Sequence, residues 1–170
     1  MIILYYKVFH ITKLINFKHM KNTFILILIS FTLISCTKQS VVLDHKFDNN
    51  QWGMSNVEFK YSNNDVKNDY CIILEIELSD IYNADNFDIA MVQKNDDGET
   101  RYSSYSINVK NRMGDFIETK ADSGFYTYSI MINPKTKFAS KSSYYFSFEH
   151  RMSVVSISGI ALMKLKINQL

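Results

Sequence analysis

The side chain with the clearest chemistry in this sequence is the thiol of Cys36. It follows an apolar run from Phe24 to Ile34 and then Ser35, after which the chain becomes polar at once. The run is too short to span a bilayer, which needs roughly 20 apolar residues, but it has the length of a signal-peptide core. A cysteine in this position is typical of a bacterial lipobox. We therefore predict cleavage between Ser35 and Cys36, and lipidation of Cys36 as a lasting membrane anchor.

The leader before Cys36 is predicted to lie outside the fold. Met20 followed by Lys21 would supply the start and the positively charged region of a signal peptide, with residues 1–19 as an upstream extension. The alternative is a core cysteine behind an uncleaved helix, which fits the charge and length pattern less well. Residues 1–35 then form the extension and signal peptide. Residues 36–40 form the lipidated N-terminus and a linker, and residues 41–170 form one domain.

Charge and cysteine content restrict the partners of the mature chain. The 135 residues from Cys36 onward carry 15 basic and 17 acidic side chains, a net charge of −2, and no basic stripe. A nucleic-acid partner is therefore not predicted. Once Cys36 is acylated only Cys71 remains, so no disulfide within the chain is expected.

The other groups that could do chemistry do not form a recognisable catalytic or metal-binding set. The histidines His45 and His150 and the thiol of Cys71 lack zinc-ligand spacing, and no nucleophile accompanies His150. We expect His150 to be partly buried and hydrogen-bonded. The acids of "NDDGE" lack the alternating oxygen ligands of a calcium loop, and a hairpin explains Gly98 as well. We predict no catalytic residue, no metal and no cofactor.

The elements that must position these groups are strands. In "YCIILEIELS" apolar side chains from Tyr70 to Leu78 alternate with Glu75 and Glu77, which is the period of a half-buried strand. Polar breaks, among them Asn133-Pro134, separate similar runs. These facts predict an all-β domain, an antiparallel β-sandwich of about eight strands that resembles a jelly roll. The further runs are residues 41–47, 56–61, 86–94, 101–109, 125–132, 143–152 and 159–167.

Aromatic residues suggest a binding role for the domain. Trp52, Tyr126, Tyr128 and Tyr145 could form an exposed row of rings that stacks on sugars, although tyrosine also favours strands for structural reasons alone. A glycan-binding module is therefore an open alternative, and burial of these rings would remove its basis.

A second group of candidates lies at the end of "YYFSFEHRM". His150 ends an apolar row that contains Tyr144, Phe146 and Phe148. Glu149 and Arg151 share the opposite face of the strand, where they could form an ion pair. We list Trp52, His150 and Arg151 as possible partner-binding residues.

Nearly the whole mature chain resembles the GldH family of gliding-motility lipoproteins of Bacteroidetes. The resemblance rests on the leader ending in Cys36, on Trp52, and on the segments "DYCIILEIE", "NFDIAMV", "DGET", "NRMGDF", "YYFSFEHRM" and "ISGIALMKLKI". It implies a β-sandwich lipoprotein at the cell envelope that acts in gliding beside other Gld lipoproteins and the associated secretion machinery. The family has no catalytic residues to carry over.

The resemblance and the anchor together give a leading hypothesis. The chain is expected to be a non-enzymatic envelope lipoprotein that docks on membrane or periplasmic proteins, with the glycan-binding module as the alternative and an enzyme as a third possibility. Thr37 replaces the aspartate of a common inner-membrane retention signal, and "TKQS" lacks an acidic surface-export signal. An outer-membrane location facing the periplasm is favoured, with the cell surface as the alternative.

Overall fold

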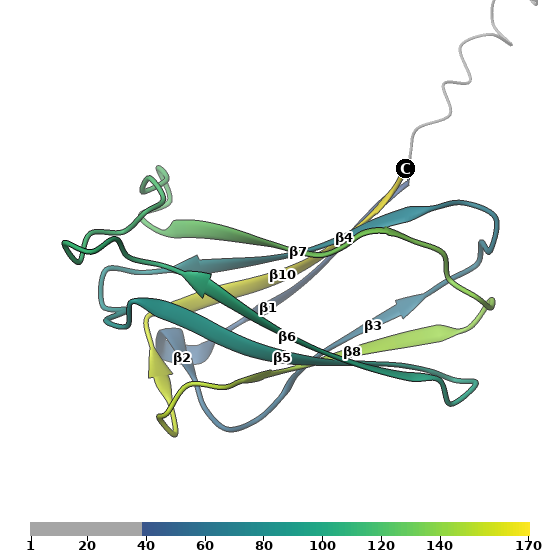
Figure 1. Ribbon diagram of the computed structural model, residues 1–170, viewed down its shortest axis with the longest axis horizontal. Coiled ribbons are helices and arrows are strands. Elements are labelled where there is room, and N and C mark those ends of the chain that lie inside the picture. Colours follow the sequence, from purple (N-terminus) through teal and green to yellow (C-terminus); the bar gives the residue numbers. More distant parts are fainter. Residues whose placement is uncertain (1–38) are drawn as a thin grey trace, which may run out of the picture. The chain divides into compact units, whose positions relative to one another are not determined.

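A computed structural model describes residues 39–170 as a domain built from two antiparallel β-sheets (Figure 1). The leader, Ser35 and Cys36 lie outside the described residues, so cleavage and lipidation stay predictions. The prediction of an all-β domain is confirmed.

Each sheet contains four long strands. The first sheet has the order β1-β10-β4-β7 and the second the order β3-β8-β5-β6, while two short strands pair only with each other. The strands are β1 (Ser40–Lys46), β2 (Gln51–Trp52), β3 (Val57–Ser62), β4 (Tyr70–Leu78), β5 (Asn86–Asn95), β6 (Thr100–Asn108), β7 (Tyr126–Thr136), β8 (Ser143–His150), β9 (Ile157–Ser158) and β10 (Ile160–Gln169), with a 3-10 turn, η1 (Asp48–Asn50), before β2.

The order of the strands is that of a jelly roll. When β2 and β9 are set aside, the first long strand pairs with the last, and successive long strands mostly alternate between the sheets. This is the double-sheet arrangement of two Greek keys. The eight predicted strands correspond to the eight long ones, with boundaries that agree within a few residues at most ends.

The core fills the space between the sheets. Alternate residues of β3, β4, β5 and β8 are buried, as the sequence period predicts. The side chains that are almost fully buried include Trp52, Tyr70, Tyr82, Phe87, Phe146, Phe148, Ile72, Leu74, Ile76, Leu78, Ile89 and Ile160.

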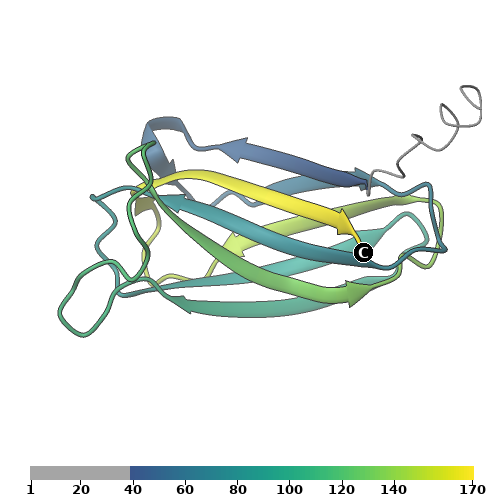
Figure 2. The same cartoon turned by 90° about the horizontal axis from the view of Figure 1, so that it is seen from above.

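The two ends of the domain differ in their loops. Ser40 pairs with Asn168, so the first described strand starts at one end of the sandwich, which we call the Ser40 end. The opposite, distal end carries the segments 47–56, 79–85, 109–125 and 151–159. In Figures 1 and 2 these segments lie on the left and the C-terminus on the right. At about 3.3 Å per residue, a ten-residue strand such as β5 separates the two ends by about 30 Å.

Two local predictions need correction. Asn133-Pro134 was expected to break a strand, but β7 continues to Thr136, since Pro134 lies on an edge strand where a missing N–H is tolerated. Strict alternation along the predicted run 159–167 would put Ala161 on the same inner row as Met163. The register with β4 shifts between Ile160 and Leu162, so that Ile160 is buried in place of Ala161.

The predicted hairpin at "NDDGE" is confirmed. Gly98 has a φ of +89° between β5 and β6, and Asn95 accepts from the Glu99 N–H through its side chain at 2.8 Å. The acids of this segment serve the turn: Asp96 accepts from the Ser143 N–H, Asp97 from the Ser140 hydroxyl, and Glu99 pairs with Arg101.

Candidate functional site

Close backbone contacts hold the distal loops together. The Ser79 N–H donates to the Gly159 carbonyl at 2.8 Å, and the Gly159 N–H donates to the Asn50 carbonyl at the same distance. Gly159 has a φ of +91°, and a Cβ there would lie 2.5 Å from the Tyr82 nitrogen. The segments 47–56, 79–85 and 151–159 are therefore packed around a position that only glycine fits.

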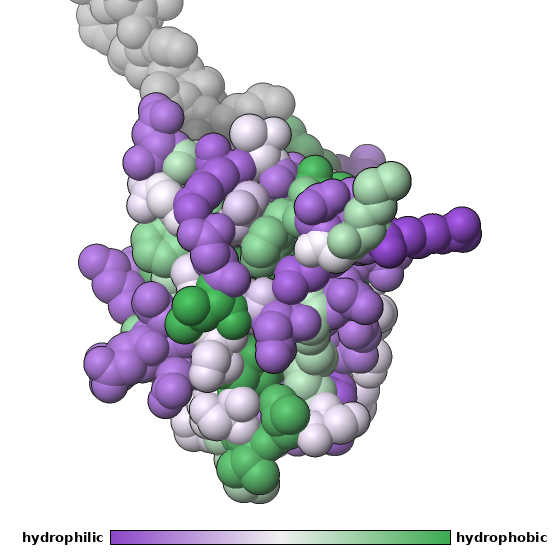
Figure 3. All heavy atoms as spheres, turned by 90° about the vertical axis from the view of Figure 1, so that its left-hand side faces the viewer, coloured by the Kyte–Doolittle hydropathy of each residue, from purple (hydrophilic) through white to green (hydrophobic). Residues whose placement is uncertain are grey.

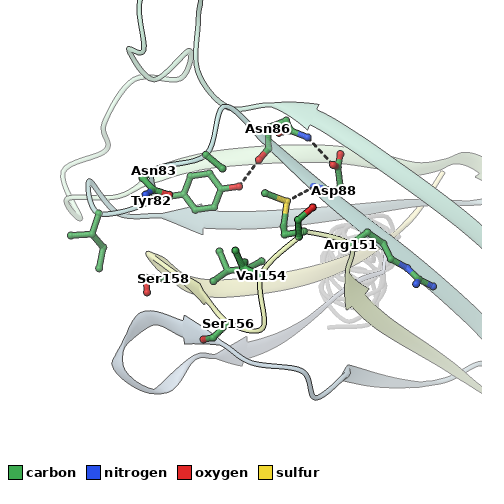
Figure 4. Close-up of a pocket in the computed structure, with 13 residues that line it drawn as sticks. Tyr82, Asn83, Asn86, Asp88, Arg151, Val154, Ser156 and Ser158 are labelled. Atoms are coloured by element: carbon green, nitrogen blue, oxygen red, sulfur yellow. Dashed lines mark hydrogen bonds between the residues drawn. The ribbon is translucent and has the colours of Figure 1, made fainter.

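A cavity of about 630 Å³ opens at this end between the segment 79–86 and the segment 151–158 (Figure 4). On one wall the Tyr82 hydroxyl donates to the Asn86 carbonyl at 2.5 Å, and the Asn86 amide donates to Asp88 at 2.7 Å. Burial, with the nearby Asp88 charge as a smaller cause, raises the pKa of Tyr82. On the other wall Met152 accepts from the Asp88 N–H at 3.4 Å. These hydrogen bonds link the backbone and side chains of residues 82–88 to one another and to Met152.

A second hollow of about 430 Å³ lies on the other side of the segment 151–155. Met54, Glu149 and His150 line it together with that segment. Residues 151–154 thus line both hollows.

The three predicted partner-binding residues lie close together, but only Arg151 is well exposed. Trp52 is 1% exposed, and its indole N–H donates to the Ser55 carbonyl at 2.9 Å. Its ring meets the half-buried His150 ring edge-on, with centroids 5.4 Å apart. Arg151 is exposed and lies 3.3 Å from Glu149, as the predicted ion pair requires. Trp52 is thus a supporting residue beneath the distal surface, and Arg151 is the member that a partner can reach.

The hydrogen bond of His150 defines its tautomer. Its Nε2 lies 3.1 Å from the Gly53 carbonyl, which can only accept, so Nε2 carries the proton. Its Nδ1 is buried without a hydrogen-bond partner in the structure. The expectation of a partly buried histidine is confirmed, but its polar atoms are satisfied only at Nε2 and not at Nδ1. Through Nε2, His150 fastens the loop at Gly53 to the end of β8.

Sequence reasoning missed the most prominent feature of the distal end, its exposed apolar side chains. They are 52% to 88% exposed and project from all four distal segments. Figure 3, which looks onto this end, shows hydrophobic atoms in the middle and at the lower margin of the face, between polar groups. The signal in the sequence was the presence of large apolar residues inside otherwise polar breaks. These residues, which we call the distal apolar set, are Met54, Ile81, Met113, Ile117, Val154 and Val155.

Charges of both signs border the distal apolar set. The Lys120 ammonium donates to Asp80, and the Tyr126 hydroxyl donates to the same carboxylate at 3.1 Å. These two hydrogen bonds lower the pKa of Asp80, and the bond from Lys120 has the larger effect. Apolar groups with a rim of paired charges are the composition of a protein-binding surface.

The rings proposed for glycan stacking do not form a row. Trp52 and Tyr128 are 1% and 5% exposed. Tyr126 begins β7 at the distal end and stacks on Phe116 with centroids 3.9 Å apart, whereas Tyr145 lies near the start of β8 at the Ser40 end. The glycan alternative therefore loses the arrangement on which it depended.

Residues 39–170 contain neither a cluster of metal ligands nor a membrane-spanning helix. No group of three or more His, Cys, Asp or Glu side chains is placed to hold a metal ion in this part of the chain. No helix in the same residues is long and apolar enough to cross a membrane.

Several solved structures are similar to the chain. Among solved structures it is similar to the VP2 subviral particle of infectious bursal disease virus, with 14% identity, a TM-score of 0.40, and coverage of 79% of this chain but only a third (33%) of that one. It is similar to the Yersinia pseudotuberculosis-derived mitogen, with 9% identity, a TM-score of 0.33, and coverage of 77% and 86%. It is also similar to the C-terminal family 22 carbohydrate-binding module of Clostridium thermocellum Xyn10B, with 11% identity, a TM-score of 0.34, and coverage of 76% and 79%. None of these likenesses bears on function.

The sequence itself gives the more specific result. No curated protein sequence matches it. The family model described as GldH lipoprotein, however, matches residues 42–167, which include all of β2 to β9 and most of β1 and β10. The match covers well over half of the chain and confirms the resemblance drawn from its motifs. The chain belongs to the GldH lipoprotein family.

Proposed function

We propose that this envelope lipoprotein is a non-enzymatic component of gliding motility or of the associated envelope and secretion machinery. It is held by Cys36 in the outer membrane, faces the periplasm, and docks on a protein partner through its distal end. The observation that carries the docking role is the distal apolar set, which lies at the end of the sandwich opposite Ser40.

The position of the anchor explains why that end is the one offered to a partner. Cys36 precedes Ser40 by four residues, which span at most about 14 Å when fully extended. The Ser40 end is therefore kept close to the bilayer. The distal end, about 30 Å farther along the strands, is free to reach a membrane-bound or periplasmic assembly.

The composition of the distal end supports a protein as the partner. Side chains such as Met54 and Val155 lie in water in this structure at a free-energy cost that burial against a partner would remove. Arg151 adds an exposed guanidinium at the border of both hollows, and arginine is enriched in protein interfaces. The absence of aspartate after Cys36 supports the outer membrane as the location.

The experiment is deletion of the gene in the source bacterium, followed by complementation. Wild type, Cys36→Ala and a distal variant, Val155→Asp, are compared with the surface control Tyr102→Asp. Colony spreading and secreted proteins are scored, the acyl group is identified by mass spectrometry, and the proteins that co-purify from membranes are identified.

Wild type and Tyr102→Asp should restore the lost phenotype and retain the same envelope proteins. Cys36→Ala should lose the acyl group and the phenotype, and Val155→Asp should keep the acyl group but lose the co-purifying proteins. Normal spreading and secretion in the deletion strain would overturn the motility role. The non-enzymatic role would be overturned if the pure protein hydrolysed a polysaccharide or an ester and a single point variant abolished that activity.

A further inference from the structure

One register row crosses the outer face of the sheet that contains β1. Val42 pairs with Lys166, Lys166 with Ile73, and Ile73 with Met131, so one residue from each of the four strands lies in a line. These side chains alternate with the buried rows and therefore point away from the core.

The row is mostly apolar and partly exposed. Val42 and Met131 are each 51% exposed, and Ile73 is half-buried between them. The thiol of Cys71, two residues before Ile73, lies 3.5 Å from the Met131 sulfur. We call Val42, Cys71, Ile73 and Met131 the outer-face patch. Lys166 lies within the patch, but its ammonium pairs with Glu75 at 2.5 Å, so that it contributes mainly the methylene groups of its side chain.

Charged side chains limit the outer-face patch on the side toward the distal end. Lys164 pairs with Glu77 at 2.7 Å and lies opposite Asp44 in the register. With the Lys166–Glu75 pair, these residues form a ladder of charges across β1, β10 and β4. The outer-face patch thus lies between this ladder and a polar pair at the end of the sheet, where the Ser40 hydroxyl donates to Asn168 at 2.6 Å.

Two basic residues follow the patch along the chain, one near the end of β7 and one directly after it. Lys135 and Lys137 both lie close to Asp69, at 3.2 Å and 3.9 Å, and are well exposed. One carboxylate therefore faces two ammonium groups, which leaves a local excess of positive charge. An apolar patch beside basic side chains is the composition of a surface that rests on anionic lipid headgroups.

The covalent chain limits how far this surface can be from the lipid. Val42 follows Cys36 by six residues, which reach at most about 22 Å when fully extended. An acylated Cys36 would therefore keep a lipid surface within reach of the patch at all times, whereas a second copy is present only when two chains meet.

We propose that the outer-face patch is a membrane-docking surface, which rests on the phospholipid leaflet that holds the acyl chains of Cys36. The inference rests on the proposed lipid anchor and adds to it an orientation. The apolar part of the outer face contacts the boundary of headgroups and acyl chains, Lys135 and Lys137 meet anionic headgroups, and the charge ladder marks where the domain rises into water. The distal apolar set then points away from the bilayer.

The test uses the full lipidated chain in vesicles of phosphatidylethanolamine and phosphatidylglycerol. In a Cys71→Ser background, single cysteines replace Val42, Met131, Tyr102 and Val155 in turn and carry an environment-sensitive fluorophore. Tyr102 lies on the edge strand β6 of the other sheet and is 76% exposed, so it is the matched control for an exposed side chain far from the patch. Quenching is measured with iodide in the water and with brominated lipid in the bilayer.

Probes at positions 42 and 131 should be quenched severalfold more by brominated lipid, and severalfold less by iodide, than probes at positions 102 and 155. Equal quenching at all four positions would overturn the proposal. Protection from iodide without quenching by lipid, together with cross-links between position 42 of two chains, would also overturn it and would assign the patch to a second copy.

The anchor is tested separately in the same preparation. The Cys71→Ser parent should float with the vesicles and take up no fluorophore, because an acylated Cys36 has no free thiol. Failure to float, with labelling at Cys36, would contradict the proposed anchor. A floating, unlabelled parent with equal quenching at every position would contradict the docking surface alone.

Discussion

Replacing Gly159 by alanine should destabilise the domain far more than the same change at another glycine of similar conformation. Gly159 has a φ of +91° and Gly114 a φ of +87°, so the left-handed strain of an alanine, about 1–2 kcal/mol, is shared by both variants. Both alanines also reduce the conformational entropy of the unfolded chain, which stabilises each variant by about 0.4–1 kcal/mol and offsets part of that strain. The variants differ in space: a Cβ at position 159 meets the Tyr82 backbone at 2.5 Å, whereas nothing lies within 4 Å of one at position 114.

Backbone atoms must move to relieve a contact of that kind, which costs about 1–3 kcal/mol in a packed region. We therefore expect Gly159→Ala to lower the free energy of unfolding by about 1–3 kcal/mol more than Gly114→Ala. The assay is equilibrium urea unfolding of residues 38–170, followed by the fluorescence of the single, buried Trp52. Equal losses in the two variants, with unchanged urea dependence, would refute the close packing of the distal loops at Gly159.

Three further predictions concern stability. Trp52→Ala should cost about 3–5 kcal/mol by emptying a buried site, while Met54→Ala nearby should change stability by less than about 0.5 kcal/mol, as thermal unfolding followed by circular dichroism will show. Burial raises the pKa of Tyr61 to about 12, so its contribution to stability is present below pH 10, the pKa of an exposed tyrosine, and is lost as the pH rises toward 12. Tyr61→Phe should flatten that alkaline loss, and an unchanged pH profile would contradict it. Glu75→Gln should cost no more than about 1 kcal/mol at low salt, with a smaller difference at high salt, since its pair with Lys166 is partly exposed.

Much of the fold could be predicted because it follows from the period of apolar residues. The alternation from Tyr70 to Leu78 needs no knowledge of neighbouring strands, and it located β4 within one residue of its ends. The partners of β4 were beyond reach, since its neighbour β10 lies at the other end of the chain. The short strands β2 and β9 were missed for a related reason. Two residues cannot show a period, and these strands are defined only by their pairing with each other, Gln51 with Ser158 and Trp52 with Ile157.

The candidate site was predictable only in part. The apolar row of β8 correctly placed His150 at the border of the core. The burial of Trp52 could not be read from the sequence, because it depends on the turn at Asn49 and Asn50, which both adopt positive φ, and on packing against His150. The distal apolar set draws on four segments that are far apart in the chain, so only tertiary structure reveals that they lie at the same end of the sandwich.

Photo-cross-linking in native membranes will show whether the protein contacts its partner through the distal end. A photoreactive amino acid replaces Val155 at the distal end or Tyr102 on the edge of the second sheet, in the lipidated chain within its own bacterium. We predict a cross-link from position 155 to an envelope protein of the motility or secretion machinery, lost when Cys36 is replaced by alanine, and none to that protein from position 102. Cross-linking of the same protein from position 102 but not from position 155 would contradict the account.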